Sequence, residues 1–221
     1  MTKTWLYLSA TAFLLTANAS AAATFNFVSM ADNNSDPNFI GSVEKNWSDV
    51  FPGGLTIDGI TLNASGSNVN QNFADAFFDK GNAGLGVCST THGTNGSSGC
   101  ATGIGSNTSD DNVQNSQGGE TLTLDFGKTV SISDIFFNDD GHVALSGGLN
   151  INGNAVTVSN GLVTDGFEFL SGSSVYNFSY TQSQFYLASA TVAPVPLPAT
   201  GFLFLSALGG LGLARRRRKA A

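Results

Sequence analysis

Two cysteines, Cys88 and Cys100, are the side chains in this sequence best suited to covalent chemistry. They bracket a stretch rich in Gly, Ser and Thr, and the loop they would close has 13 residues counting both ends. In an oxidising compartment two such cysteines usually pair, so we predict a disulfide if the chain is exported. His92 lies between them, but no fourth ligand stands at a spacing typical of zinc sites.

Two acidic stretches could ligate a hard cation. The first is Asp110, Asp111 and Asn112, whose oxygens in a flexible loop suit Ca²⁺. The spaced carboxylates of an EF-hand are missing, and a turn that caps the next strand explains the same residues. The second stretch, residues 138–142 (NDDGH), has a stronger alternative, because Asp-Gly between two strands is typical of a hairpin. Calcium therefore remains one hypothesis for both stretches.

Aromatic side chains could bind sugars by stacking on pyranose rings. Trp47 is the first candidate, and Tyr176, Tyr180 and Tyr186 are further ones. This interpretation requires exposed rings. The alternative is that Trp47 packs at the edge of the core.

Catalytic motifs are missing from the sequence. His92 and His142 are the only histidines, and no G-x-S-x-G, HExxH or Walker A pattern is present. Glu44, Glu120 and Glu168 are the only glutamates, and sequence cannot show whether two acids face one sugar. We predict a protein without enzymatic activity.

The elements that must position these residues are short strands. Apolar and polar residues alternate in many segments, and Asn-Gly or Asp-Gly pairs separate them. The expected strands are residues 24–30, 55–62, 120–126, 129–137, 142–146, 155–159, 164–170, 174–180 and 184–192. They predict one all-β domain, residues 24–192, folded as an antiparallel β-sandwich, first a jelly roll and second an immunoglobulin-like sandwich. Residues 65–72 and 81–119 are expected to be long loops.

One segment shows the alternation most clearly. Leu122, Leu124 and Phe126 should face the core, with polar residues between them. The pattern shifts at residues 135–137, which predicts a bulge or a fully buried strand end.

Charge narrows the possible partners. The whole chain carries a net charge of −7, but six of its nine Lys and Arg lie in the two terminal segments. The expected domain keeps Lys45, Lys80 and Lys128 against sixteen Asp and Glu, a net charge of −13. Nucleic acids and anionic membranes need clusters of Lys and Arg, so they are excluded as partners. Divalent cations, neutral sugars and basic surfaces remain.

The N-terminus has the three parts of a signal peptide. Lys3 precedes an apolar run, and small residues follow at Ala17-Asn18-Ala19 and Ala21-Ala22-Ala23. We expect cleavage after Ala23, giving a signal peptide of residues 1–23. An uncleaved anchor is the alternative.

The C-terminal segment, residues 193–221, also has three parts. Two prolines at alternate positions stiffen the first part, Val195, Pro196, Leu197, Pro198 and Ala199. Residues 200–214 are apolar and would form about 22 Å of helix, short of a hydrocarbon core of about 30 Å. A basic block at residues 215–219 would stay on the cytoplasmic side; its arginines are Arg215, Arg216, Arg217 and Arg218.

This tail resembles the PEP-CTERM sorting signals, in their VPLPA form, from Val195 to Lys219. The resemblance implies recognition by an exosortase-type transpeptidase in the inner membrane of a Gram-negative bacterium, transient anchoring, and delivery to the cell surface or matrix with exopolysaccharide. The stretches GLGVC at 84–88, DDNV at 110–113 and GETLTLDF at 119–126 also resemble an arrangement in small exported PEP-CTERM proteins. An alternative is that residues 197–201 (LPATG) are an LPxTG sortase motif.

The sequence therefore favours a non-enzymatic exported surface or matrix protein, sorted by an exosortase and associated with exopolysaccharide and biofilm. The second hypothesis is a lectin-like carbohydrate-binding module, with or without Ca²⁺. The third is a sortase-anchored wall protein or a glycan hydrolase.

Overall fold

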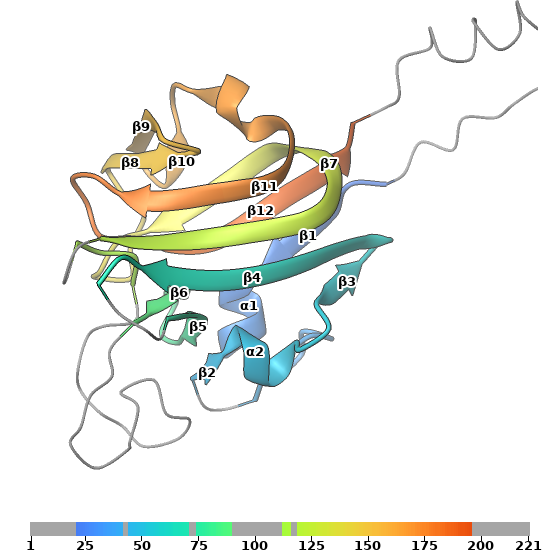
Figure 1. The fold of residues 1–221 in the computed structure, drawn as a ribbon. Coiled ribbons are helices and arrows are strands. Elements are labelled where there is room, and N and C mark those ends of the chain that lie inside the picture. The colour runs from blue at the N-terminus through green and yellow to red at the C-terminus, as the bar shows by residue number, and fades with distance from the viewer. Residues whose placement is uncertain (1–20, 42–43, 71–73, 90–111, 116–118, 196–221) are drawn as a thin grey trace, which may run out of the picture.

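The computed structural model describes residues 21–41, 44–70, 74–89, 112–115 and 119–195. These residues are mostly β-strand (Figure 1). The strands are β1 (Ala23–Asn26), β2 (Lys45–Asn46), β3 (Leu55–Ile57), β4 (Ile60–Asn68), β5 (Asp75–Asp79), β6 (Gly84–Cys88), β7 (Glu120–Asn138), β8 (Gly147–Ile151), β9 (Asn154–Ser159), β10 (Leu162–Val163), β11 (Ser171–Tyr180) and β12 (Tyr186–Pro194). The helices are α1 (Phe27–Asp32), α2 (Trp47–Val50) and the 3₁₀ turn η2 (Phe167–Leu170).

β7 organises the sheet because it is long enough to serve two sets of neighbours. Its first half pairs with β4 and β11, and its second half pairs with β12. One part of the sheet has the strand order β10-β9-β8-β11-β7. It closes on itself because β10 also pairs with β7, where Leu162 lies opposite Phe136. The all-β prediction is confirmed, but this closure is barrel-like and does not give the two separate sheets of a sandwich or jelly roll.

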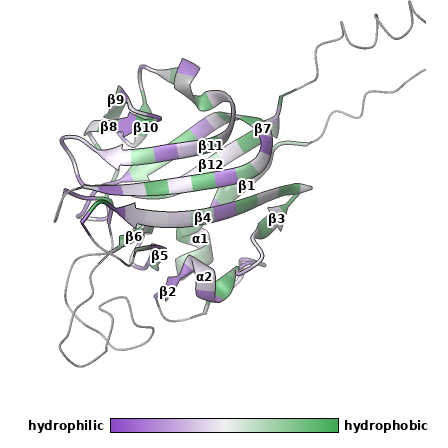
Figure 2. Ribbon diagram, viewed as in Figure 1, coloured by the Kyte–Doolittle hydropathy of each residue, from purple (hydrophilic) through white to green (hydrophobic). Residues whose placement is uncertain are grey.

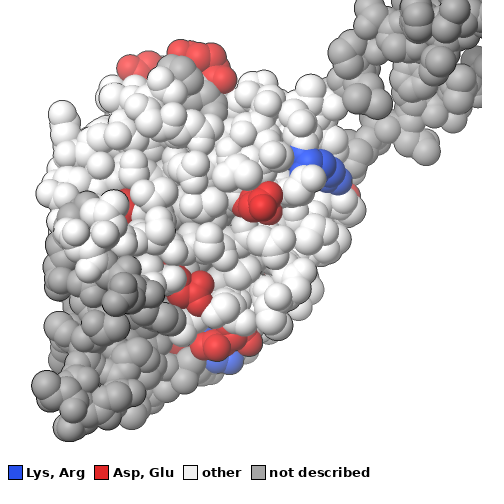
Figure 3. All heavy atoms as spheres, viewed as in Figure 1, with Lys and Arg blue, Asp and Glu red and all other residues white. Residues whose placement is uncertain are grey.

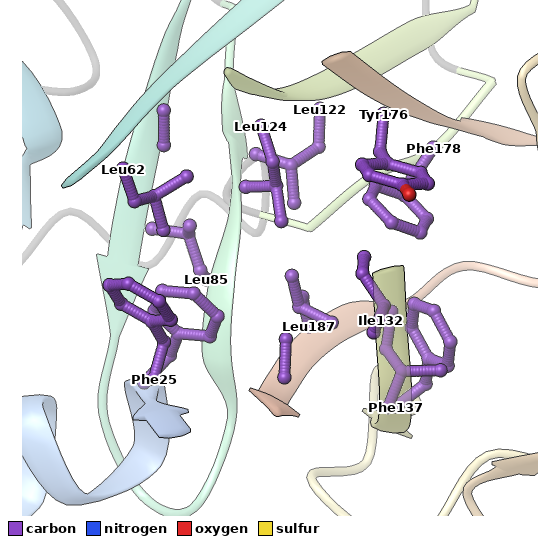
Figure 4. Close-up of a cluster of buried hydrophobic side chains, with 14 of the residues drawn as sticks. Phe25, Leu62, Leu85, Leu122, Leu124, Ile132, Phe137, Tyr176, Phe178 and Leu187 are labelled. Carbon is purple, nitrogen blue, oxygen red and sulfur yellow. The ribbon is translucent and has the colours of Figure 1, made fainter. Parts of the chain in front are cut away.

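The core lies inside this closure. Leu122, Leu124 and Phe126 are buried, as their alternation predicts, and the hydropathy of the first half of β7 alternates along the strand (Figure 2). Figure 4 shows side chains from opposite walls meeting there. The labelled side chains are Phe25, Leu62, Leu85, Leu122, Leu124, Ile132, Phe137, Tyr176, Phe178 and Leu187.

Helices α1 and α2 cover one side of the sheet beside β5 and β6 (Figure 1). Asn26 caps α1, because its side-chain oxygen accepts the backbone N–H of Ser29 at 2.9 Å. Helix α2 buries Trp47 against Phe78, with the two rings stacked at 5.7 Å. Both helices thus add aromatic surface to the same core.

The turns mostly follow their sequence signals. Asp58-Gly59, Asn152-Gly153 and Asn160-Gly161 all have positive φ at both residues, as tight hairpins require. The 139–142 loop differs, because the left-handed residue there is His142, with φ +60°, and not Gly141.

The predicted membrane helix at 200–214 lies outside the described residues. Within the part of the chain that the structure describes, no helix is both long and apolar enough to cross a bilayer.

Candidate functional site

The two ends of the long strands differ in chemistry. At one end, β1 begins and β12 ends beside the bend of β7, and we call this the exit end. At the opposite end, where β4 and β11 end and β7 and β12 begin, polar side chains gather, most of them buried. We call these the polar cluster: the buried Asn68, Ser89, Asn112, Gln114 and Glu120, the half-buried Gln184 and the exposed Asp140.

Glu120 is the centre of the polar cluster. Its side chain is 1% exposed, and its two carboxylate oxygens accept from the Ser89 hydroxyl and from the backbone N–H of Gln114, the latter at 3.0 Å. Asn68 in turn donates to the Ser89 hydroxyl at 3.1 Å. A buried carboxylate is tolerated only with such donors, so the network holds Gln114 and Glu120 against Ser89, the residue after β6.

The structure brings the two acidic stretches together through a single contact. Asn112 Nδ2 donates to Asp140 Oδ1 at 2.6 Å. Asn112 is 1% exposed, and its Oδ1 has no hydrogen-bond partner. A small open pocket of about 240 Å³ adjoins this contact and is lined by Asp139, Asp140, Ser146, Ser183 and Gln184. Asp110 and Asp111 lie outside the described residues.

Among the described side chains, no group of three or more His, Cys, Asp or Glu is placed to hold a metal ion. Asp139 Oδ1 instead accepts the backbone N–H groups of Gly141 and Val143, at 2.8 and 3.2 Å. Calcium at Asn112 therefore stays a prediction that depends on ligands beyond these residues.

His142 fastens the 139–142 loop to the β5–β6 turn. Its Nε2 lies 3.2 Å from Asp79 Oδ2, and its Nδ1 lies 2.9 Å from the carbonyl oxygen of Gly81. Asp32 accepts the backbone N–H groups of Gly81 and Asn82, at 3.1 and 2.7 Å. These contacts join α1, the β5–β6 turn and the β7–β8 loop, and they occupy both ring nitrogens.

Cys88 ends β6 beside Ser89, next to the polar cluster. It is 3% exposed and disulfide-bonded, and no described cysteine is free. Cys100 lies outside the described residues, so the pairing of Cys88 with Cys100 remains a prediction.

Trp47 cannot be a sugar-stacking residue, and that prediction is wrong. Its ring is 2% exposed and packs between Phe78 and Phe51, with centroid distances of 5.7 and 4.9 Å. Tyr176 and Tyr186 are buried as well. These three aromatic residues lie in the core, where burial of each ring removes a large apolar area from water.

Sequence reasoning missed an open groove beside β8 and β9. Its volume is about 700 Å³, and Gly147, Gly148, Thr157, Asp165, Thr181 and Gln182 line it. No aromatic periodicity marks this groove. The signal in the sequence was the pair of adjacent glycines, Gly147 and Gly148, among its lining residues.

Comparison with known proteins identifies the C-terminal segment. The family model of the PEP-CTERM protein-sorting motif matches residues 194–219. No curated protein and no solved structure matches the chain.

The chain therefore carries a PEP-CTERM sorting signal, as its residues predict. This class of signal implies an exported protein that an exosortase, a membrane protein, recognises and sorts, with transient anchoring in the membrane. Val195, Pro196, Leu197, Pro198 and Ala199 lie inside the match, and so do Arg215, Arg216, Arg217 and Arg218. The match favours the exosortase interpretation over LPxTG.

Proposed function

We propose that the protein is a non-enzymatic component of the cell surface or extracellular matrix of a Gram-negative bacterium, and that it associates with exopolysaccharide. The observation that carries the first part is the sorting signal directly after the last strand of the sheet. Exosortase action would release the tail and leave the β domain outside the cell.

The surface charge supports a neutral polar ligand. Charged groups are sparse on the face in Figure 3, and most of those visible are acidic. An acidic surface with few cations repels nucleic acids and anionic lipids. Uncharged sugars are compatible with it.

The groove beside β8 and β9 supports the second part. Hydroxyl and amide groups of Thr157, Thr181 and Gln182 line it together with Gly147 and Gly148. Sugars are bound by such groups, which both donate and accept hydrogen bonds. We therefore take this groove as the candidate site for a neutral glycan.

The groove favours binding over hydrolysis. Asp165 is its carboxylate, and both of its oxygens are occupied by Thr157: Oδ1 accepts the backbone N–H at 2.6 Å and Oδ2 accepts the hydroxyl at 3.3 Å. Glycoside hydrolysis needs two carboxyl groups that flank one bond. Asp165 instead fixes the loop that forms the groove wall.

Binding of the mature protein to exopolysaccharide purified from its own host tests the proposal. The variant Gly148→Leu should fill the groove, since a Cβ at Gly148 meets its nearest neighbours at an ordinary 3.4 to 3.6 Å. We expect at least a tenfold loss of affinity, because the sugar would lose its place in the groove. Ser133→Leu, on the exposed face of β7, is the matched control and should bind like the wild type.

Three outcomes would contradict the proposal. Wild-type protein that does not bind the polysaccharide would remove its second part. Equal binding by Gly148→Leu would place the ligand elsewhere. Release of new reducing ends from the polysaccharide would show an enzyme.

A further inference from the structure

The sorting signal begins on the folded domain itself. Pro194 is the last residue of β12 and lies opposite Val130 of β7. The next residue, Val195, is the first of the VPLPA motif, and its N–H donates to the carbonyl oxygen of Thr129 at 3.3 Å. No spacer separates the domain from the residues that the exosortase must read.

The N-terminal segment leaves the domain at the same place. Ala23, the first residue of β1, lies opposite Val192 of β12. Figure 1 shows the two chain ends leaving side by side. The exit end therefore faces whatever holds the termini before they are processed.

The distance between the exit end and the membrane is short. Five residue steps join Val195 to Thr200, where the apolar run begins. Extended proline-rich chain advances about 3.1 Å per residue, which gives about 16 Å. Roughly 5 to 7 Å of that lies in the headgroup layer, so about 10 Å remains between the domain and the lipid surface.

A gap of about 10 Å is the width of one α-helix, which is about 10–12 Å with its side chains. An enzyme that grips the backbone between Val195 and Thr200 must fill that gap. It must therefore contact the domain on one side while it sits in the membrane on the other.

The backbone of the exit end suits such a close approach. Gly59 lies in the β3–β4 turn, Gly127 at the bend of β7 and Gly172 at a register shift in β11, and a Cβ on any of the three would meet nothing within 4 Å. Lys128 stands in the middle, and its Nζ donates to the carbonyl oxygen of Gly59 at 2.8 Å. The three glycines leave these positions without side chains that would keep a partner away.

We propose that the exit end, formed by the β3–β4 turn at Gly59, the bend of β7 at Gly127–Thr129 and β11 at Gly172, is the surface on which the exosortase docks while it cuts the tail. The proposal rests on the sorting signal and not on polysaccharide binding. The partner is a membrane-embedded transpeptidase. It must contact the domain because no spacer separates the end of β12 from the sorting motif.

Photo-crosslinking in the native host tests this contact. A benzophenone amino acid replaces Lys128 at the exit end or Gln182 at the opposite end of the sheet, in cells whose exosortase lacks its nucleophile so that the precursor accumulates. We expect an adduct with the exosortase from position 128, at least fivefold stronger than from position 182. Equal adducts, or none from position 128, would overturn the proposal.

A spacer provides the second measurement. Twelve Gly and Ser residues between Pro194 and Val195 would span about 20 Å on average. With this insertion, the adduct from position 128 should fall several-fold while active exosortase still removes the tail. An unchanged adduct would overturn the proposal. Intact mass reads tail removal separately, and a retained wild-type tail would overturn the sorting assignment and this inference with it.

Discussion

The hydroxyl of Tyr176 donates a 2.7 Å hydrogen bond to the carbonyl oxygen of Val130, just after the bend of β7. The same hydroxyl lies 3.0 Å from the carbonyl oxygen of Leu170, where η2 meets β11. Tyr176 is fully buried, and burial raises the pKa of its phenol. One side chain therefore ties β11 to the bend that lets β7 serve two sets of strands.

Replacement Tyr176→Phe should lower the free energy of unfolding by about 1–3 kcal/mol, because a buried carbonyl group loses its hydrogen-bond donor. Urea denaturation of the mature protein measures the loss. The control is Tyr180→Phe, whose hydroxyl makes a 3.3 Å bond at the surface and should cost little. Equal losses in the two variants would argue against a special role for Tyr176.

Asp75 should make stability depend on pH. Burial raises its pKa above 3.8, and the hydrogen bond from Ser48 opposes that shift only in part. A raised folded pKa means that the contribution to stability is full below 3.8 and is lost as the pH rises through the folded value. Wild type should therefore lose stability relative to Asp75→Asn as the pH rises above about 4. Urea midpoints measured at increasing pH give the difference, and a wild type that gains stability relative to Asp75→Asn with rising pH would contradict this assignment.

The predicted disulfide should stabilise the domain by about 3 kcal/mol, the chain-entropy value for a loop of this length. The variant Cys100→Ser tests it, because it leaves the buried Cys88 in the sheet. Reduction of the wild type should reproduce the loss. Two titratable thiols in the native protein would disprove the pairing.

Calcium should raise the melting temperature if Asn112 Oδ1 is a ligand. At a calcium concentration 100 times the Kd, the gain would be about 2.7 kcal/mol, and EDTA should reverse it. Asn112→Ala should abolish the response, whereas Asn115→Ala, an exposed neighbour, should keep it. If calcium does not change the melting temperature of the wild type, the hypothesis that Asn112 Oδ1 binds calcium is wrong, and water is the partner of this atom.

The position of Ala23 predicts where the signal peptide is cut. Ala23 is fully buried and paired in β1, whereas Ala21 and Ala22 are exposed and outside the strand. Cleavage after Ala23 would remove that buried residue, so we now expect cleavage after Ala19, at the Ala17-Asn18-Ala19 site. Edman sequencing or intact mass should show Ser20 as the first residue. A mature chain beginning at Thr24 would contradict this prediction.

Sequence reasoning found the strands whose two faces differ. The alternation at Leu122, Leu124 and Phe126 predicts β7, and the irregularity expected at residues 135–137 is confirmed. The extra residue lies in the partner strand, where Ala188 falls between the paired Leu187 and Ser189. The sequence did not show that residues 120–126 and 129–137 are one strand, because Gly127 suggests a turn but here continues the ladder through a bend.

Strands buried on both faces escaped detection. All residues of β5 and β6 are buried, so neither strand alternates. Gly84 lies so close to the Leu187 carbonyl that a Cβ there would clash, which explains a glycine in a strand. The expected loops at 65–72 and 81–119 were wrong where β4 and β6 occupy them, and residues 164–170, expected as a strand, contain η2 after Gly166 with φ +77°.

The polar cluster depends on contacts between residues that are distant in the sequence, and the spacing of residues along the chain does not reveal such contacts. The meeting of Asn112 with Asp140, and of Glu120 with Ser89, joins residues more than 25 positions apart. The sorting signal was predictable because a membrane enzyme reads it as sequence. The groove beside β8 and β9 was not predictable, because its lining residues come from separate segments and share no sequence motif.

The pairing of β1 with β12 also governs when the protein can fold. The hydroxyls of Thr24 and Thr191 lie 3.1 Å apart although 167 positions separate them. A chain secreted from its N-terminus must wait for its last strand before β1 finds a neighbour, and such non-local pairing is slow. Until then the precursor lacks a complete sheet and can pass through a translocation pore. During that time the strand edge that will pair with β1 is open, and other chains could pair with it. Completion of the sheet is thus coupled to arrival of the tail in the membrane.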